Sequence, residues 1–325
     1  MSGGSSSRRS FGAFLAGRLA QSLPLLLVIS LIVFALIHAA PGGPLSMYLS
    51  NPNVRPEDIE RLRRALGLDR PLWQQYVSWL AAFIRGDWGY SFSDGRPVVQ
   101  RIAERVPATL ELVGSSVIVA LLVTFPAAIG AAVRRARVFD RITSAMAVGG
   151  ISLPVFWFGL LLQLIFASAL GWLPSSGREQ AGGGDFADRI QHLILPVAAL
   201  AFVQAAAWSR YLRASLVDVL ARPFVLAARA RGLPRRLVVY RHALRNAIGP
   251  LVTIVLLDSA LVVSGAVVTE SVFAWPGLGS LFTEALARRD YTILMALLML
   301  TSTAVVVLNL AADAAYALLD PRVTL

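Results

Sequence analysis

Long apolar runs separated by polar segments dominate this chain. Six runs approach or exceed the length of about 20 residues that a helix needs to cross the hydrocarbon core of a bilayer. Backbone groups in lipid must hydrogen-bond within their own segment, so runs of this length predict helices. The runs cover residues 19–40, 110–133, 142–170, 193–208, 247–269 and 291–319. The pattern predicts an all-α polytopic membrane bundle of about six transmembrane helices.

The polar segments divide the chain into four parts. Residues 1–18 are predicted to form a cytoplasmic tail and residues 19–40 the first transmembrane helix. Residues 41–107 form an extracytoplasmic helical insertion. Residues 108–320 form a five-helix transmembrane core, which includes a polar loop at 210–246.

Two amphipathic helices are predicted inside the insertion. In residues 55–67, acidic residues precede arginines and a glycine follows, as helix electrostatics and capping favour. A second helix is expected over residues 71–84, with one apolar side formed by Leu72, Tyr76, Trp79 and Phe83. Two hypotheses remain open for the insertion: a cap at the membrane interface without chemistry, or a seat for an external partner protein.

Composition excludes several classes of function. The chain is 56% hydrophobic and 15% charged, which is typical of a membrane protein. All 30 basic residues are arginines, so the lysine that a P-loop requires is absent and ATP hydrolysis by that route is excluded. The chain has no cysteine, His38 and His192 are isolated, and His242 with Asn246 four residues on is a poor metal pair, so we expect no metal site. We predict a non-enzymatic chain without a cofactor of its own.

Arginine placement predicts the orientation in the membrane. With the N-terminus inside, the cytoplasmic segments hold 17 arginines and 3 acidic residues, whereas the external segments hold 13 arginines and 14 acidic residues. The positive-inside rule therefore places both termini in the cytoplasm. The net charge of +11 does not indicate nucleic-acid binding, because the excess lies where topology predicts it.

The arginine-rich loop at 210–246 has strong helix punctuation. Pro223 fits the first turn of a helix, and Gly232 fits the position after a helix end, where φ is positive. Pro234 can then open a second helix. The sequence therefore predicts a short helix, a sharp bend and another helix at the cytoplasmic surface, an arrangement suited to docking.

This loop resembles the EAA loop of ABC-importer permeases, and further segments resemble the dipeptide, oligopeptide and nickel branch of that family. They read LRRALGLDRPL at 62–72, GDWGYS at 86–91, RVPATL at 105–110, SLPVFWFGL at 152–160, ESVFAWPGLG at 270–279, RDY at 289–291, NLAAD at 309–313 and DPR at 320–322. Their order and spacing together are specific. The chain departs from the pattern at Leu226, which stands at the position of the loop's glutamate, and in the segment 41–44.

The resemblance implies that residues 224–232 form a coupling helix that docks on an ATPase subunit. The expected small contacts are Ala227, Ala228 and Ala230, while Arg229 and Arg231 can pair with acidic residues of the partner. The full set of coupling residues is Phe224, Ala227, Ala228, Arg229, Arg231, Gly232, Leu233, His242 and Asn246. The alternative is an interfacial helix whose arginines meet anionic lipid.

Two carboxylates fall inside apolar runs, where a charge costs about 2.5–3.5 kcal/mol, so each must face protein or water. Asp313 is expected to make an interhelical polar contact near the cytoplasmic end of its run. Asp258 shares a face with Gly265 and suits either a pathway or a structural contact. Glu270 and Trp275 belong to an outer loop for which a gate and a plug without special function are both open.

The resemblance implies a permease subunit of an ATP-driven importer in the bacterial inner membrane, with di- or oligopeptides as the expected substrates. Its implied partners are a second homologous permease, two P-loop ATPase subunits that hold ATP and Mg, and an extracytoplasmic substrate-binding protein. Nickel complexes, glutathione or another small solute are alternative substrates. An ion-coupled secondary transporter that uses Asp258 is the alternative of a different class.

Overall fold

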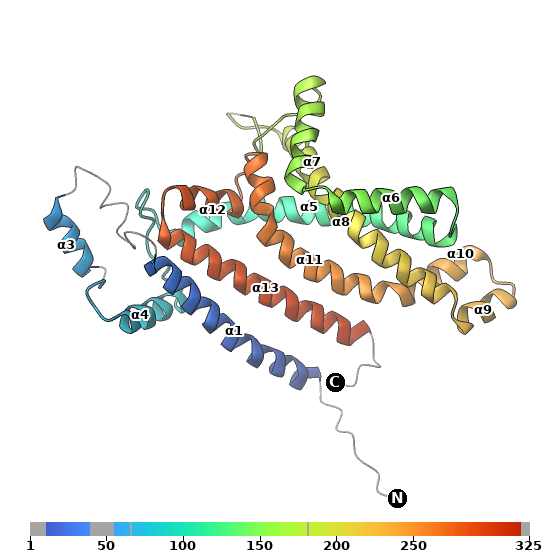
Figure 1. The fold of residues 1–325 in the computed structure, drawn as a ribbon, viewed down its shortest axis with the longest axis horizontal. Helices are drawn as coiled ribbons and strands as arrows, with labels where there is room; N and C mark the ends of the chain where they lie inside the picture. Colours follow the sequence, from blue (N-terminus) through green and yellow to red (C-terminus); the bar gives the residue numbers. More distant parts are fainter. Residues whose placement is uncertain (1–10, 40–54, 66, 181, 320–325) are drawn as a thin grey trace, which may run out of the picture. The chain divides into compact units, whose positions relative to one another are not determined.

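The computed structural model describes residues 11–39, 55–65, 67–180 and 182–319, and the regular elements within these ranges are helices. This confirms the predicted all-α class. The predicted tail up to residue 10, the start of the insertion and the DPR segment lie outside the described residues. The elements are α1 (Phe11–Ala39), α3 (Pro56–Ala65), α4 (Leu72–Ile84), α5 (Val98–Val133), α6 (Val138–Ser152), α7 (Val155–Leu162), the π-helix η2 (Gln163–Ala169), α8 (Phe186–Leu220), α9 (Pro223–Ala230), α10 (Arg235–Leu237), the π-helix η3 (Val238–Ala243), α11 (Leu244–Val272), α12 (Leu278–Ala287) and α13 (Tyr291–Leu319) (Figure 1).

The chain forms two compact units. The first comprises Met1–Arg18, Leu110–Trp275 and Val307–Leu325, and so contains the predicted coupling loop. The second comprises Leu19–Thr109 and Pro276–Val306. The polar insertion after the first apolar run therefore shares a unit with α12, which follows it by about half the chain.

Four helices within the described residues are long and apolar enough to cross a membrane. A fifth span is possible if two helices joined by a bend, Val138–Ser152 and Val155–Ala169, act together. The fifth apolar run, at 247–269, lies within the 29-residue helix α11. The four single spans are Ala16–Ala39, Val98–Val133, Phe186–Leu220 and Tyr291–Ala317.

The expectation of one continuous helix over residues 142–170 is wrong. α6 ends at Ser152, and the next helical segment runs at an angle of 104° to it. Leu153 has extended backbone angles (φ −87°, ψ 128°), as the ring of a following proline demands, and Pro154 has no N–H to continue the ladder. Hydropathy alone did not reveal the break, because the residues on both sides of it are apolar and an apolar run need not form one straight helix.

The core of the first unit is built around α8, which packs against α6, α7 and α11. Trp208, Leu212 and Leu216 of α8 are fully buried in this core. Small residues allow the helices to approach closely: a Cβ on Gly150 of α6 would lie 2.7 Å from the Cβ of Ala206. α8 is therefore the element to which the neighbouring helices of this unit are fixed.

In the second unit, the two predicted helices of the insertion are present as α3 and α4. Tyr76, Trp79 and Phe83 of α4 pack inward as predicted, and the Tyr76 hydroxyl lies 2.8 Å from the Ser30 hydroxyl of α1. Leu72 begins the same side of the helix, four residues before Tyr76, but it is 61% exposed and does not pack inward with the three aromatic residues. The His38 ring of α1 also lies 3.2 Å from the amide oxygen of Gln75, so α4 is held against α1 by aromatic packing and two polar contacts.

Candidate functional site at the α9 loop

The α9 loop begins and ends as its proline and glycine predict. Pro223 occupies the first helical turn, where its missing N–H costs no bond. At the other end Gly232 has φ +77°. The Gly232 N–H donates to the Arg229 carbonyl (2.9 Å), and the Leu233 N–H donates to the Ala228 carbonyl (3.4 Å). This Schellman motif turns the chain sharply after two helical turns. The predicted helix, bend and second helix are confirmed.

α9 has one face in the core and one face in solvent. Val225 and Ala228 are buried at 0% and 1% exposure and belong to the core of α8. Ala228 therefore fixes α9 to its own chain and does not lie on the surface open to a partner. The exposed residues of the predicted coupling segment are Phe224, Ala227, Arg229, Arg231 and Gly232, with Leu226 and Ala230 beside them.

After the bend, α10, η3 and α11 follow one another without a break. Leu233 is half-buried, and Val238 and Val239 are buried in the α8 core. The Asn246 amide donates to the backbone carbonyl of His242 (2.7 Å), so this pair closes one turn of helix through the backbone. Sequence spacing brought the two residues together, but the His242 side chain is not the group that Asn246 binds.

An ion pair that the sequence did not suggest braces the helix leading into α9. The Arg213 guanidinium of α8 binds the Asp140 carboxylate of α6 with two bonds, at 2.5 and 2.8 Å. The Ala136 N–H adds a third bond to Asp140, 2.8 Å long. Asp140 is the acidic residue in the arginine-rich segment 134–141, which was its one signal in the sequence. The brace links α8 to the α5–α6 turn.

The intramembrane carboxylates each have a partner. Asp313 pairs with Arg18 (3.3 Å), which agrees with the expected interhelical contact. Asp258 accepts a hydrogen bond from the indole N–H of the buried Trp208 (2.7 Å). This bond accounts for Asp258 as a structural contact between α8 and α11.

The remaining gate candidates lie at the end of α11. Glu270 and Trp275 are fully buried, and the Trp275 N–H donates to the Glu270 carbonyl (2.8 Å) across Ala274, whose φ is +47°. Burial of both side chains describes a closed, well-packed turn. Gly265 lies within α11, but its surroundings are outside the described residues.

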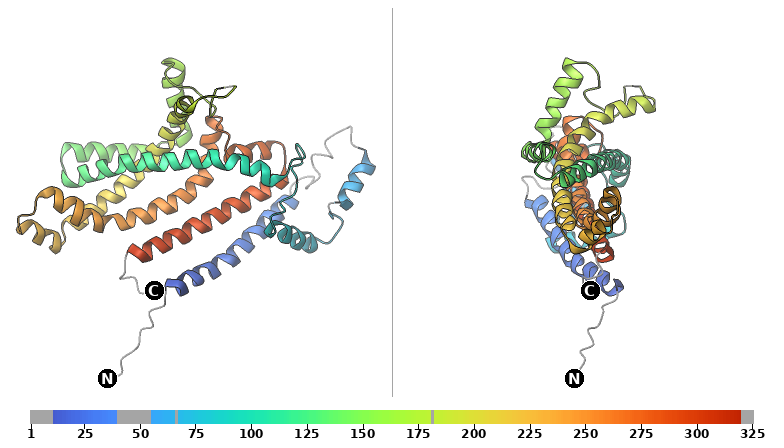
Figure 2. Two further views of the ribbon diagram at one scale, coloured as in Figure 1. Left: turned by 180° about the vertical axis from the view of Figure 1, so that it is seen from behind. Right: turned by 90° about the vertical axis from the view of Figure 1, so that its right-hand side faces the viewer.

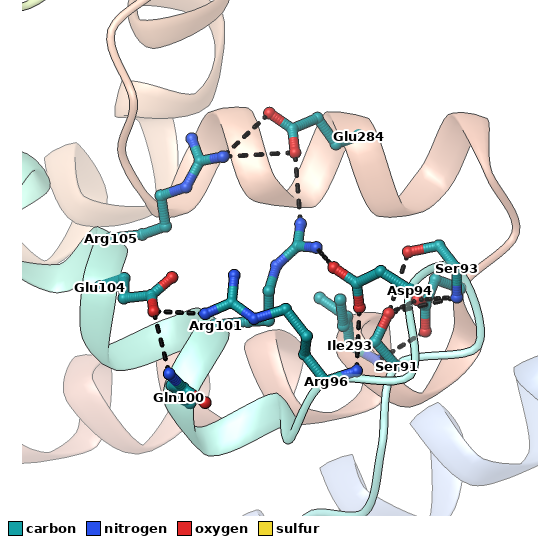
Figure 3. Close-up of polar contacts among 11 residues, drawn as sticks. Ser91, Ser93, Asp94, Arg96, Gln100, Arg101, Glu104, Arg105, Glu284 and Ile293 are labelled. Atoms are coloured by element: carbon teal, nitrogen blue, oxygen red, sulfur yellow. Dashed lines mark hydrogen bonds and ion pairs between the residues drawn. The ribbon is translucent and has the colours of Figure 1, made fainter.

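The second unit contains a polar network that joins two of the family-like motifs (Figure 3). The Ser91 hydroxyl donates to the Asp290 carboxylate (2.6 Å), which is fully buried. The Ser93 N–H adds a bond of 3.1 Å. The Asp290 carboxylate also accepts from the Ile293 N–H at the start of α13 (3.4 Å). The sequence offered no signal for this pairing, because the partners lie 199 residues apart.

The same unit pairs its arginines with acidic residues. Arg101 of α5 bridges Asp94 and Glu284, and Arg105 binds Glu284 of α12 (3.3 Å) (Figure 3). Burial alone would raise the pKa of Asp94, but hydrogen bonds from the Arg96 N–H and from the Arg101 guanidinium outweigh it and lower the pKa. Among the described residues, no group of three His, Cys, Asp or Glu side chains is placed to hold a metal ion.

Comparison with known families decides what kind of protein carries this loop. The family model for "Binding-protein-dependent transport system inner membrane component" matches residues 124–325. The chain belongs to this family. The N-terminal model of the same transport systems matches residues 12–113, so the two matches cover nearly the whole chain and confirm the resemblance found in the motifs.

Relatives of this inner membrane component match it end to end. It is 38% identical over 313 residues to the oligopeptide transport system permease protein AppB of Bacillus subtilis (strain 168), covering 96% of this chain and 99% of that protein. It is 34% identical over 332 residues to the dipeptide transport system permease protein DppB of Escherichia coli (strain K12), covering 95% and 98%. It is 39% identical over 306 residues to the glutathione transport system permease protein GsiC of Escherichia coli (strain K12), covering 94% and 97%.

A solved structure shares the fold. An inward-facing MetNI methionine ABC transporter aligns with a TM-score of 0.57 and 17% identity, covering 69% of this chain and 98% of that one. This likeness shows the helical fold alone, and the family model and the permease relatives show that the chain is a membrane permease.

Proposed function

We propose that this permease imports di- or oligopeptides together with a second homologous permease, two ATPase subunits and an external binding protein. The observation that carries the coupling role is α9, which has Val225 and Ala228 in the α8 core and its arginines in solvent. A partner that binds and displaces the outer face of α9 would also move the α8 core, because the inner face of α9 is packed into that core.

The route from α9 into the bundle follows the packing of the first unit. α9 shares its core with α8 and α11, whose contact is extensive. Arg213 carries the motion to the α5–α6 turn through Asp140. ATP-driven closure of the ATPases would in this way switch the bundle between inward- and outward-facing states, with ATP and Mg held by the ATPases and not by this chain.

Orientation follows from the arginine distribution. The loop at 210–246 and the 134–141 segment hold most of the arginines assigned to the cytoplasm, so we place both termini on that side. The second unit then presents α3 and α4 to the exterior, where the binding protein would dock.

The relatives named for oligopeptide and dipeptide transport support peptides as substrates. The similarity to GsiC favours glutathione, itself a small peptide, as the second candidate. The ion-coupled alternative is not favoured, because Asp258 is engaged by Trp208. Uptake of labelled dipeptide, tetrapeptide and glutathione by membrane vesicles, with and without ATP inside, separates these options.

Co-purification from native membranes tests the coupling role. The wild-type chain should bring down a second permease and P-loop ATPases, and Arg229→Glu/Arg231→Glu should lose the ATPases while keeping the permease. The matched control is Arg241→Glu/Arg245→Glu, which reverses two exposed arginines of η3 and α11 outside α9. If the control loses the ATPases equally, or if the α9 variant retains them, the coupling role of α9 is refuted.

A further inference from the structure

A groove of about 480 Å³ lies between the cytoplasmic end of α5, the α5–α6 turn and the α10–η3 segment. The α5–α6 turn and the α10–η3 segment lie at the same end of the first unit (Figures 1 and 2). Four arginines line the groove: Arg134, Arg137, Arg235 and Arg236. None of the described residues that line it is acidic. The groove is therefore a concentrated site of positive charge.

The nearest acidic residue in sequence does not neutralise this charge. Asp140 is committed to Arg213 and to the Ala136 N–H, on the α8 side of the turn. One N–H of the Arg235 guanidinium donates to the Val133 carbonyl (2.8 Å), and the guanidinium has further N–H donors. Arg134 lies over the Phe139 ring, 5.3 Å from its centre, which fixes the guanidinium beside the groove.

The remaining lining of the groove is apolar and continues into the membrane. Pro126 and Ile129 belong to the membrane-spanning helix α5, and Pro126 lies one turn from Leu122, which is 69% exposed. Tyr240, which is 58% exposed, flanks the arginines on the other side. Tyrosine at the boundary between an apolar strip and a basic cluster is typical of the lipid headgroup level.

We propose that this groove binds an anionic phospholipid. Its phosphate lies among Arg134, Arg137, Arg235 and Arg236, and an acyl chain follows Pro126 toward Leu122 along α5. An acidic protein segment would match the charge but would not need the apolar strip that leads to Leu122. Placing the lipid in the cytoplasmic leaflet rests on the orientation given under the proposed function.

The bound lipid would add a link between the α5–α6 turn and α10. Arg235 of α10 already donates to the carbonyl of Val133, the last residue of α5, and a phosphate between Arg137 and Arg236 adds a link to the turn itself. Lipid binding should therefore raise the unfolding temperature of the chain, because a ligand that binds only the folded state stabilises it.

The test is a titration of the full chain, purified in mild detergent and delipidated. Thermal unfolding is followed with dioctanoyl phosphatidylglycerol, with dioctanoyl phosphatidylcholine and with inorganic phosphate. Arg137→Gln/Arg236→Gln should weaken the apparent phosphatidylglycerol affinity about 30-fold, at about one kcal/mol for each arginine. The matched control is Arg141→Gln/Arg241→Gln, which removes two charges from the same segments outside the groove.

Phosphatidylglycerol should stabilise the wild type and the control, whereas phosphatidylcholine and phosphate should not. Mass spectrometry of co-purified lipid should show anionic lipid lost from the groove variant alone. An equal response to phosphatidylcholine, a full response to phosphate, or an equal loss in the control would overturn the proposal. So would loss of the ATPases from the groove variant with unchanged lipid affinity, since that would assign the groove to a protein. Failure of the α9 variants to release the ATPases would refute the coupling role and leave this titration intact.

Discussion

The arginines of the second unit's polar network and those on and just after α9 differ in what they contact. In the second unit Arg101 and Arg105 are largely buried and bind the carboxylates of Asp94 and Glu284. In the first unit Arg229, Arg231 and Arg236 are exposed on the α9 loop, and the packing that holds the loop is apolar. A paired arginine stabilises its own fold by binding a carboxylate of the same chain, whereas an exposed arginine can bind a partner or a ligand. Apolar packing fixes the inner side of α9, and the outer side exposes its arginines to solvent.

The first unit also contains paired arginines, and breaking the pair of Arg213 with the buried Asp140 should give the largest effect. Arg213→Ala leaves the buried Asp140 without its cation, which should cost about 3–5 kcal/mol of the free energy of unfolding. Chemical unfolding in detergent measures the loss, with Arg210→Ala as the control on the same helix. A loss as small as that of the control would show that Asp140 is served well enough by the Ala136 N–H.

Removing one bond of the second unit's network should have a smaller effect. Ser91→Ala takes a donor from the buried Asp290 carboxylate, and a hydrogen bond to a charged group is worth about 1.5–3 kcal/mol. Ser271→Ala is a suitable control, because that exposed hydroxyl only returns to its own helix at Val267. If both variants unfold alike, the network does not contribute as its geometry indicates.

Enlarging one alanine on each face of α9 should separate the contribution of the inner face to stability from the contribution of the outer face to ATPase binding. Ala228→Leu overpacks the core and should lower the free energy of unfolding by about 1–3 kcal/mol. Ala227→Leu lies in solvent and should change stability by less than about 0.5 kcal/mol, yet it should reduce ATPase recovery in the pull-down. Stability changes of the same size in both variants would contradict the assignment of the two faces.

The smallest effect is expected from acid. Because the folded pKa of Asp94 lies below its ordinary value of 3.8, this carboxylate stabilises the fold above that pH. The contribution should fade as the pH drops from about 4 through the lowered pKa. Asp94→Asn should flatten the acid limb of a stability profile, and an unchanged limb would show that Asp94 is not linked to folding.

Local patterns in the sequence anticipated much of the loop. Pro223 and Gly232 mark the ends of α9, because a missing N–H and a positive φ are requirements met within one turn of chain. The face of α9 that each alanine occupies could not be read in the same way. Eight residues offer too little periodicity to distinguish an inner alanine from an outer one, so the burial of Ala228 was visible only in the fold.

The sequence by itself determined the apolar helices, their predicted orientation, the helix–bend–helix of the loop at 210–246 and the family. These properties depend on hydropathy and on backbone limits, which act along the chain. The tertiary structure decided that Asp140 meets Arg213, that Asp258 meets Trp208 and that Asp290 meets Ser91. A carboxylate in an apolar setting requires a hydrogen-bond donor, so the sequence predicts that such a donor exists. Which donor meets it depends on helix packing, because the partners lie 50 to 199 residues apart.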